Sequence, residues 1–146
     1  MTLKLTTVVA ISFLASTGFG FAESHGKGDI AKGKKLFKKC AACHSIGPDA
    51  KVKVGPPMNG IIGRTAGAYE GMKYGKSIVA AGEAGLVWTE DELFNYLKNP
   101  KKYLRARLDD KKAKSKMAYK MKKDADRTNI IAYLATFAED GSQKAE

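Results

Sequence analysis

The sequence predicts an all-α domain built of helices and ordered loops, and three observations lead to this fold class. No stretch alternates between apolar and polar residues as a half-buried strand does. Several segments combine helix start signals with apolar residues at helical spacing. Cys40, Cys43 and His44 form a Cys-x-x-Cys-His motif, the pattern for covalent attachment of a c-type haem. The predicted domain therefore wraps a few helices and loops around one covalently bound haem.

The motif predicts that both thiols become thioethers of the haem and that His44 binds its iron as the proximal ligand. A thioredoxin-like dithiol is expected near a βαβ pattern, which this chain lacks. A zinc site needs about four ligands, and the only further Cys or His is His25, in a polar, glycine-rich stretch. A Cys40–Cys43 disulfide would close a very short loop and leave His44 unexplained.

Residues 1–22 are predicted to be a cleaved secretory signal peptide. Lys4 precedes an apolar run over 8–15, and small residues stand before the cut after Ala22. The alternative is an N-terminal membrane anchor, but the run is shorter than the roughly 20 residues that a span requires and lacks a stop-transfer flank. We therefore expect export to the periplasm, with no stable membrane insertion.

The remaining residues, 23–146, are expected to form a single domain with its core over 28–138 and a frayed polar tail over 140–146. Cleavage lowers the formal charge only from +11 to +10. So basic a surface implies an acidic partner. No nucleic-acid motif is present, and an exported protein rarely meets its genome, so we expect an acidic protein surface and not nucleic acid.

The first predicted helix starts at Asp29, a plausible N-cap, and leads to Cys40. Its residues at helical spacing are Ile30, Gly33, Leu36 and Phe37. Gly33 would allow another backbone, such as that of the closing helix, to approach closely, although a lone glycine in a helix can also simply be tolerated.

Residues 45–85 are rich in glycine and contain three of the four prolines, and they predict ordered loops. So long a loop segment is unusual in a compact domain, but a large buried porphyrin would give it a surface to pack against. We expect one short helical turn over 76–81.

Thr89 to Glu92 form a capping box, flanked by Trp88 and Leu93 as a hydrophobic staple, and predict a helix start. Asn99 and Pro100 end that helix and open a second short one, with proline at its first position. The closing amphipathic helix is expected over 126–138, with an apolar face formed by Ile130, Tyr133, Leu134 and Phe137.

The ligand opposite His44 decides whether the haem is open to substrates or closed. The candidates after residue 22 are Met58, Met72, Met117 and Met121. Methionine usually fills a core, but Met117 stands in a strongly polar run, where a buried thioether needs a reason. Met117 is therefore favoured, and the other three remain candidates.

Several motifs follow one another in the order found in class I c-type cytochromes. Over residues 28–138 the chain resembles this family, and most closely its bacterial cytochrome c2 group. The matching positions are Gly33 and Phe37, 40–44, Gly55-Pro56, Gly63-Arg64, Tyr74, Trp88, Tyr96, 99–103, 115–117 and 131–134.

The resemblance implies specific roles at the axial positions of the iron. Met117 would be the second axial ligand, and the Pro56 carbonyl would accept the ring N–H of His44 and so orient the imidazole. Tyr96 would lie near the methionine sulfur and tune the iron potential, although simple core packing is the alternative for this tyrosine.

The resemblance also implies a buried haem propionate. Tyr74 and Trp88 would donate hydrogen bonds to it, with Arg64 nearby, and so lower the cost of burying its charge. Core packing is again the alternative for both aromatics. Compared with mitochondrial members, the segments 78–86 and 104–114 are longer, Ile78 replaces a polar residue and Pro57 an asparagine, which leaves potential and loop geometry open.

The function implied is that of a soluble, monomeric, periplasmic one-electron carrier and not of an enzyme. Its electrons would pass from a cytochrome bc1 type complex to a photosynthetic reaction centre or a terminal oxidase. The alternatives are a ligand-binding or peroxidase-like haem protein with an open sixth position, and a haem-based binding or assembly module. The family's basic docking ring falls at or near Lys35, Lys39, Lys53, Lys101, Lys116, Lys122 and Lys123.

Overall fold

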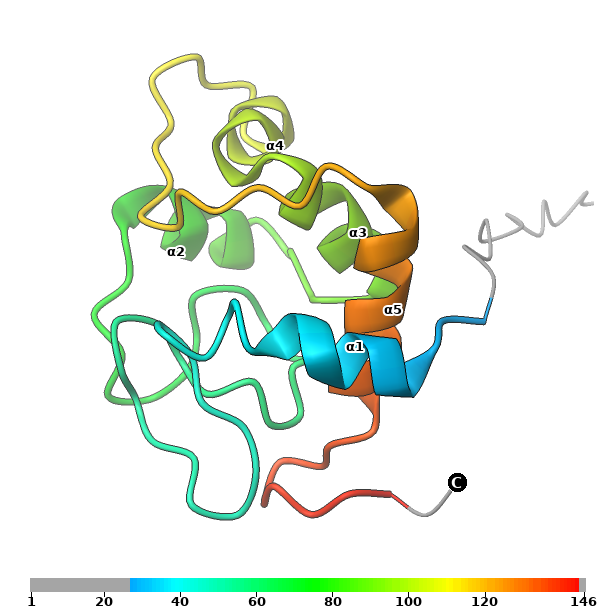
Figure 1. Ribbon diagram of the computed structural model, residues 1–146. Helices are drawn as coiled ribbons and strands as arrows, with labels where there is room; N and C mark the ends of the chain where they lie inside the picture. Colours follow the sequence, from blue (N-terminus) through cyan, green and yellow to red (C-terminus); the bar gives the residue numbers. More distant parts are fainter. Residues whose placement is uncertain (1–26, 145–146) are drawn as a thin grey trace, which may run out of the picture.

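The computed structural model describes residues 27–144 and confirms the all-α class. Within this range the chain forms no strand, only two isolated β-bridges. Its predicted signal peptide, residues 1–22, lies outside the described residues. No helix between residues 27 and 144 has the length and apolar character to cross a membrane. The helices are α1 (Ile30–Phe37), α2 (Lys76–Glu83), α3 (Glu90–Lys98), α4 (Pro100–Arg107) and α5 (Asp124–Ala135), as shown in Figure 1.

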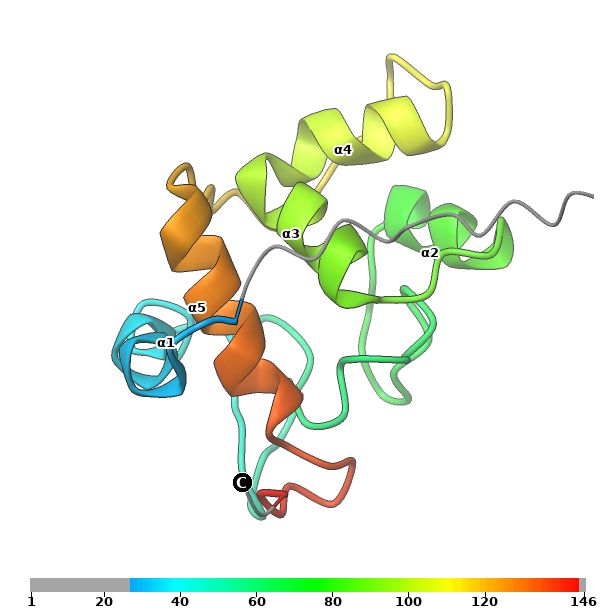
Figure 2. The same ribbon diagram turned by 90° about the vertical axis from the view of Figure 1, so that its right-hand side faces the viewer.

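The centre of the fold is the crossing of α1 and α5, the first and last helices (Figures 1 and 2). A Cβ atom on Gly33 of α1 would collide with the backbone oxygen of Asn129 and with the Cβ of Tyr133, both on α5. The expected close approach of the α5 backbone to Gly33 is therefore confirmed. The ring of Phe37 packs against that of Tyr133, with centroids 5.8 Å apart, and closes the crossing on the side of the haem motif.

Three of the helices start at the predicted N-caps. The carboxylate of Asp29 accepts a hydrogen bond from the Lys32 amide (2.9 Å). The Thr89 hydroxyl accepts one from the Glu92 amide (3.1 Å), and Asn99 caps α4 in the same way. Each side chain satisfies a backbone N–H that has no partner within its helix.

The capping box at the start of α3 forms only in part. The Glu92 carboxylate does not return to the Thr89 amide, which instead donates to Val87 O (2.9 Å). Glu92 accepts a hydrogen bond from the Tyr103 hydroxyl (2.5 Å) and pairs with Arg107 (3.1 Å), both on α4. A tertiary contact has therefore displaced the local one, and it joins α3 to α4.

Helices α2 and α5 have boundaries that differ from the prediction. Helix α2 runs to Glu83 and not to Ala81, because the left-handed turn that ends it lies at Gly85 (φ +86°). Helix α5 spans 124–135 and not 126–138. Asp124 and Asp126 both lie in its first turn, where acidic residues interact favourably with the helix dipole.

The predicted frayed tail is wrong as far as the described residues reach. The Lys144 amide donates to Thr136 O (2.8 Å), and the chain after α5 folds back beside the loop that follows α1 (Figures 1 and 2). Gly141 is buried there against the backbone of Gly47. The segment is polar in its side chains, but its backbone is paired.

Candidate functional site

The cysteine motif continues from α1 as a series of tight turns. The amides of Cys40 and Ala41 donate to Phe37 O, and those of Cys43 and His44 donate to Cys40 O (2.8–3.0 Å). Cys40 is half-buried and Cys43 exposed, and the two form no disulfide with each other.

His44 is held by the loop that returns beneath it. Its Nδ1 lies 2.8 Å from Pro56 O, and the Gly55 amide donates to Cys43 O (2.8 Å). A Cβ on Gly55 would collide with the imidazole. Burial lowers the pKa of His44, which favours the neutral ring. With its Nδ1 proton donated to Pro56, the lone pair is on Nε2, the nitrogen left to bind a metal.

Arg64 and Trp88 are brought together by backbone pairing. The Trp88 amide donates to Arg64 O (2.9 Å), and the Gly63 amide donates to Trp88 O (2.8 Å). The Arg64 guanidinium donates to Pro57 O (2.9 Å) and to Asn59 O. Tyr74 is close enough to Arg64 for each of the two groups to shift the pKa of the other. The three residues expected around a propionate, Arg64, Tyr74 and Trp88, therefore lie in one region.

Tyr96 connects Trp88 to the segment that carries Met117. The Trp88 and Tyr96 rings are 4.8 Å apart at their centroids. Burial raises the pKa of Tyr96, and a hydrogen bond with the Ser115 side chain acts in the opposite direction. The Ser115 hydroxyl also donates to Met117 O (2.9 Å). Tyr96 therefore contacts a residue two positions from Met117.

The four candidate methionines have different surroundings. Met121 is a core residue, 3% exposed. Met58 is partly buried on the same loop as Pro56, and its amide donates to Ser45 O (2.9 Å). Met72 is partly exposed and lies outside the residues packed on the core. Met117 is partly buried against the core, between exposed neighbours.

Sequence reasoning missed two residues of this region. Asn59, 7% exposed, clamps Gly47 by accepting from its amide and donating to its carbonyl (both 2.8 Å). The Tyr69 ring lies against the Arg64 guanidinium, 4.9 Å from its centroid. A buried asparagine in a glycine-rich segment gives no local signal. The dense hydrogen bonding of this loop can only be seen in the folded chain.

The seven lysines of the expected docking ring are all exposed. Within residues 27–144 none of them pairs with a carboxylate. The Lys53 ammonium donates to Ala41 O (2.7 Å), within the cysteine motif, and that of Lys116 donates to Lys73 O (2.8 Å). The other five are Lys35, Lys39, Lys101, Lys122 and Lys123.

The residues present suit a haem. Two cysteines outside any disulfide and an imidazole whose pKa is lowered by burial come from one turn, and a methionine thioether comes from a distant segment. A set of large apolar side chains packs on the core yet stays incompletely buried, as expected for the lining of an apolar group. It includes Ile46, Met58, Ile62, Ile78, Leu97 and Met117.

Comparison with known proteins agrees with this geometry. The cytochrome c family model matches residues 30–138. Cytochrome c-551 of Roseobacter denitrificans is 43% identical, over 97% of this chain and 100% of its own. Cytochrome c2 of Rhodobacter capsulatus is 44% identical, over 93% and 98%.

The fold agrees as well. The structure of cytochrome c2 from Rhodospirillum centenum superimposes with a TM-score of 0.73 at 44% identity, covering 76% of this chain and 99% of that one. Ferric cytochrome c-550 from Paracoccus versutus gives a TM-score of 0.70 at 38% identity, covering 76% and 98%. The chain therefore belongs to the cytochrome c family, as a class I c-type cytochrome with covalently bound haem c that is most similar to cytochromes c2.

Proposed function

We propose that the chain is a soluble periplasmic electron carrier and not an enzyme, with His44 and Met117 as the axial ligands of its haem. Cys40 and Cys43 would form the thioethers. The observation that carries the proposal is the hydrogen bond between His44 Nδ1 and Pro56 O (2.8 Å), because it presents Nε2 for coordination and raises the basicity of the ring. Haem c supplies one-electron chemistry when bound.

The position of Met117 supports its role as the second ligand. An axial ligand opposite His44 has to come from a segment other than the one that holds His44. Met58 belongs to the loop attached to Ser45, next to His44. Met117 belongs to a segment attached to α3, where the Met121 amide donates to Leu97 O (2.8 Å). With protein ligands on both faces, no position is left for a substrate.

Arg64, Tyr74 and Trp88 would receive a propionate. Burying a carboxylate is costly unless it is paired and hydrogen-bonded. The Arg64 guanidinium also binds two loop carbonyls, so the protein itself would hold its charge in place beside the propionate. Such preorganisation favours one orientation of the haem.

The exposed lysines would bring a partner to the site. Lys53 reaches across to Ala41 O, so its charge lies at the Cys-x-x-Cys-His motif. A basic rim at this position would steer acidic surfaces toward the haem edge and lose its effect at high salt. We infer that the donor is a cytochrome bc1 type complex and the acceptor a photosynthetic reaction centre or a terminal oxidase.

Carbon monoxide binding tests the proposal. We expect the haem absorption spectrum of the reduced native protein to stay unchanged under carbon monoxide, and the Met117→Ala variant to bind the gas. Met58→Ala serves as the matched control, because it removes a partly buried methionine on the His44 side, and it should behave as the native protein does. Ready binding by the native protein would favour a ligand-binding or peroxidase-like haem protein.

A further inference from the structure

Arg127 is the largest fully buried side chain of the described residues, at 1% exposed. It lies on the first turns of α5, and its guanidinium carbon is 4.2 Å from the centroid of the Phe94 ring on α3. An arginine this deeply buried requires strong partners. Its contacts therefore indicate what it does.

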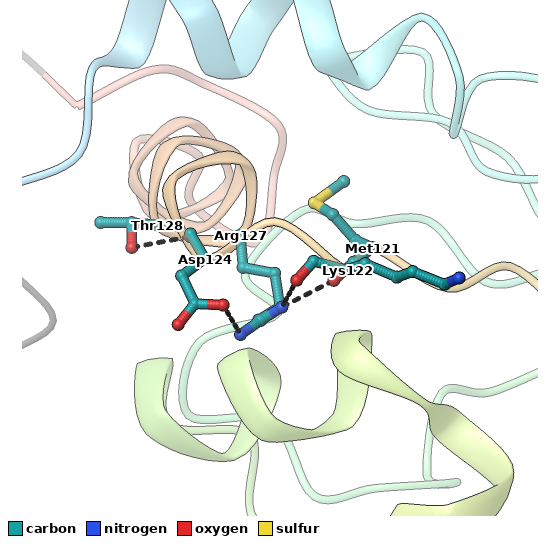
Figure 3. Close-up of polar contacts among 5 residues, drawn as sticks. All are labelled: Met121, Lys122, Asp124, Arg127 and Thr128. Atoms are coloured by element: carbon teal, nitrogen blue, oxygen red, sulfur yellow. Dashed lines mark hydrogen bonds and ion pairs between the residues drawn. The ribbon is translucent and has the colours of Figure 1, made fainter.

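Three of these contacts are hydrogen bonds, drawn in Figure 3. Nη1 donates to Met121 O (2.7 Å) and to Lys122 O (2.8 Å), and Nη2 donates to the carboxylate of Asp124 (2.7 Å). Nε is buried, and the described residues provide no partner for it. Replacing a buried ion pair as a whole by apolar side chains often leaves stability unchanged or higher, and a buried charge with an unsatisfied N–H is a weak source of stability. Stability alone therefore does not account for an arginine here.

The two carbonyls that Arg127 binds lie at the C-terminal end of the segment that carries Met117. This segment, 117–122, contains no helix or strand. Its leading end is held by Ser115, whose hydroxyl donates to Met117 O (2.9 Å), and by Lys116. Its trailing end is held by the Met121 amide on Leu97 O (2.8 Å) and by Arg127.

Residues 118–120, between these two attachments, are exposed. The trailing attachment begins four residues after Met117, so at most roughly 14 Å of extended chain separates the methionine from the carbonyl that Arg127 fixes. A shift of Met121 and Lys122 would give Met117 freedom to move, whereas a fixed trailing end restricts it.

We propose that Arg127 is a positioning residue for the second axial ligand. By holding the carbonyls of Met121 and Lys122, it limits how far Met117 can move and so sets how readily an external ligand displaces it. The inference rests on the proposed role of Met117. It goes beyond that role, because it assigns the control of ligand displacement to a residue on α5, outside the haem-binding segments.

A titration with imidazole at neutral pH tests this in the haem-loaded, oxidised protein. Loss of the near-infrared band of methionine-bound ferric haem reports displacement of Met117. The apparent affinity for imidazole scales with the fraction of molecules whose ligand segment is open. Arg127→Met keeps the length and apolar packing of the side chain but removes the donors. We expect it to bind imidazole about tenfold more tightly, equivalent to about 1.4 kcal/mol of easier opening.

Two controls separate positioning from general stability. Asp124→Asn removes the carboxylate, which is 76% exposed, but leaves both carbonyl bonds, and should bind imidazole as the native protein does. Ile130→Val and Ile130→Ala weaken the α5 core at a residue 1% exposed. Imidazole titration and urea unfolding of these two variants show how far imidazole affinity rises when the fold is merely less stable. If Arg127→Met binds imidazole no more tightly than an Ile130 variant of the same stability would, the proposal is overturned.

A second measurement needs no variant. In the native protein saturated with imidazole, the Met121 amide should keep its protection from hydrogen exchange, because Arg127 confines the movement to the residues before it. Loss of that protection would contradict the proposal. Absence of the near-infrared band from the native protein would overturn both proposals, whereas a band with unshifted affinity in Arg127→Met would overturn only this one.

Discussion

Replacing Gly33 by alanine should destabilise the fold, although helix propensity alone predicts the opposite. In a helix interior, alanine is favoured over glycine by about 0.5–1 kcal/mol. At this crossing, however, the new Cβ would collide with the backbone oxygen of Asn129 and the Cβ of Tyr133. Neither atom can be moved by a side-chain rotation, so α1 and α5 would have to separate.

The magnitude follows from these two opposing effects. Overpacking costs typically 1–3 kcal/mol, and rigid obstacles place this site at the upper end. After the gain in propensity is subtracted, we expect a loss of about 2 kcal/mol in the free energy of unfolding. For a domain of this size, that lowers Tm by roughly 6–10 °C.

Urea unfolding of the haem-loaded protein, followed by far-ultraviolet circular dichroism, measures this loss. Lys34→Ala, at an exposed position of the same helix, is the matched control and should change stability by less than about 0.5 kcal/mol. A Gly33→Ala variant as stable as the native protein, or more stable, would refute the close packing of α1 on α5.

Three further predictions concern a cap, an ionisable group and the basic surface. Asn99→Ala removes the cap of α4 and should cost about 1 kcal/mol in urea unfolding; no loss would contradict the capping role. Burial and Glu92 raise the pKa of Tyr103, so above about pH 10 the unfolded chain loses this proton before the folded one does, and stability falls as pH rises. Tyr103→Phe should make that fall of Tm with pH shallower, and an unchanged slope would argue against the buried phenol. Reversing the charge of three exposed lysines to glutamate should slow bimolecular electron transfer to an acidic redox partner, mostly at low ionic strength. The three are Lys39, Lys101 and Lys116, and unchanged rates would refute the docking ring.

Features set by neighbours in the sequence could be predicted. Asp29, Thr89 and Asn99 each cap an amide three residues ahead, and this spacing is visible in any sequence. The cysteine motif is equally local. Its chemistry depends on residues within five positions of one another, so a haem could be inferred before any fold was known.

Features set by distant residues could not be predicted in this way. Glu92 satisfies a capping pattern, yet binds Tyr103 and Arg107 on the next helix. The tail after α5 looks like a polar, unstructured end, yet its backbone pairs with Thr136 and it packs beside Gly47. In each case the deciding contact is made by groups that only the folded chain brings together.

Arg127 shows the same limit most clearly. On an amphipathic helix an arginine is expected at the surface. Helical spacing does place Arg127 on the same face as Ile130 and Leu134, but it does not indicate which groups would satisfy a buried guanidinium. Its partners are the carbonyls of Met121 and Lys122, and backbone carbonyls are present at every residue. Only the path of the chain before α5 shows which of them an arginine can reach.

The central claim, that His44 and Met117 are the axial pair of an electron carrier, is tested most directly by the near-infrared absorption of the oxidised protein before and after Met117→Ala. We predict that the native protein shows the weak band of a methionine sulfur bound to ferric haem and that the variant loses it. A native protein without the band, or a variant that retains it, would contradict the assignment of Met117 as the second ligand.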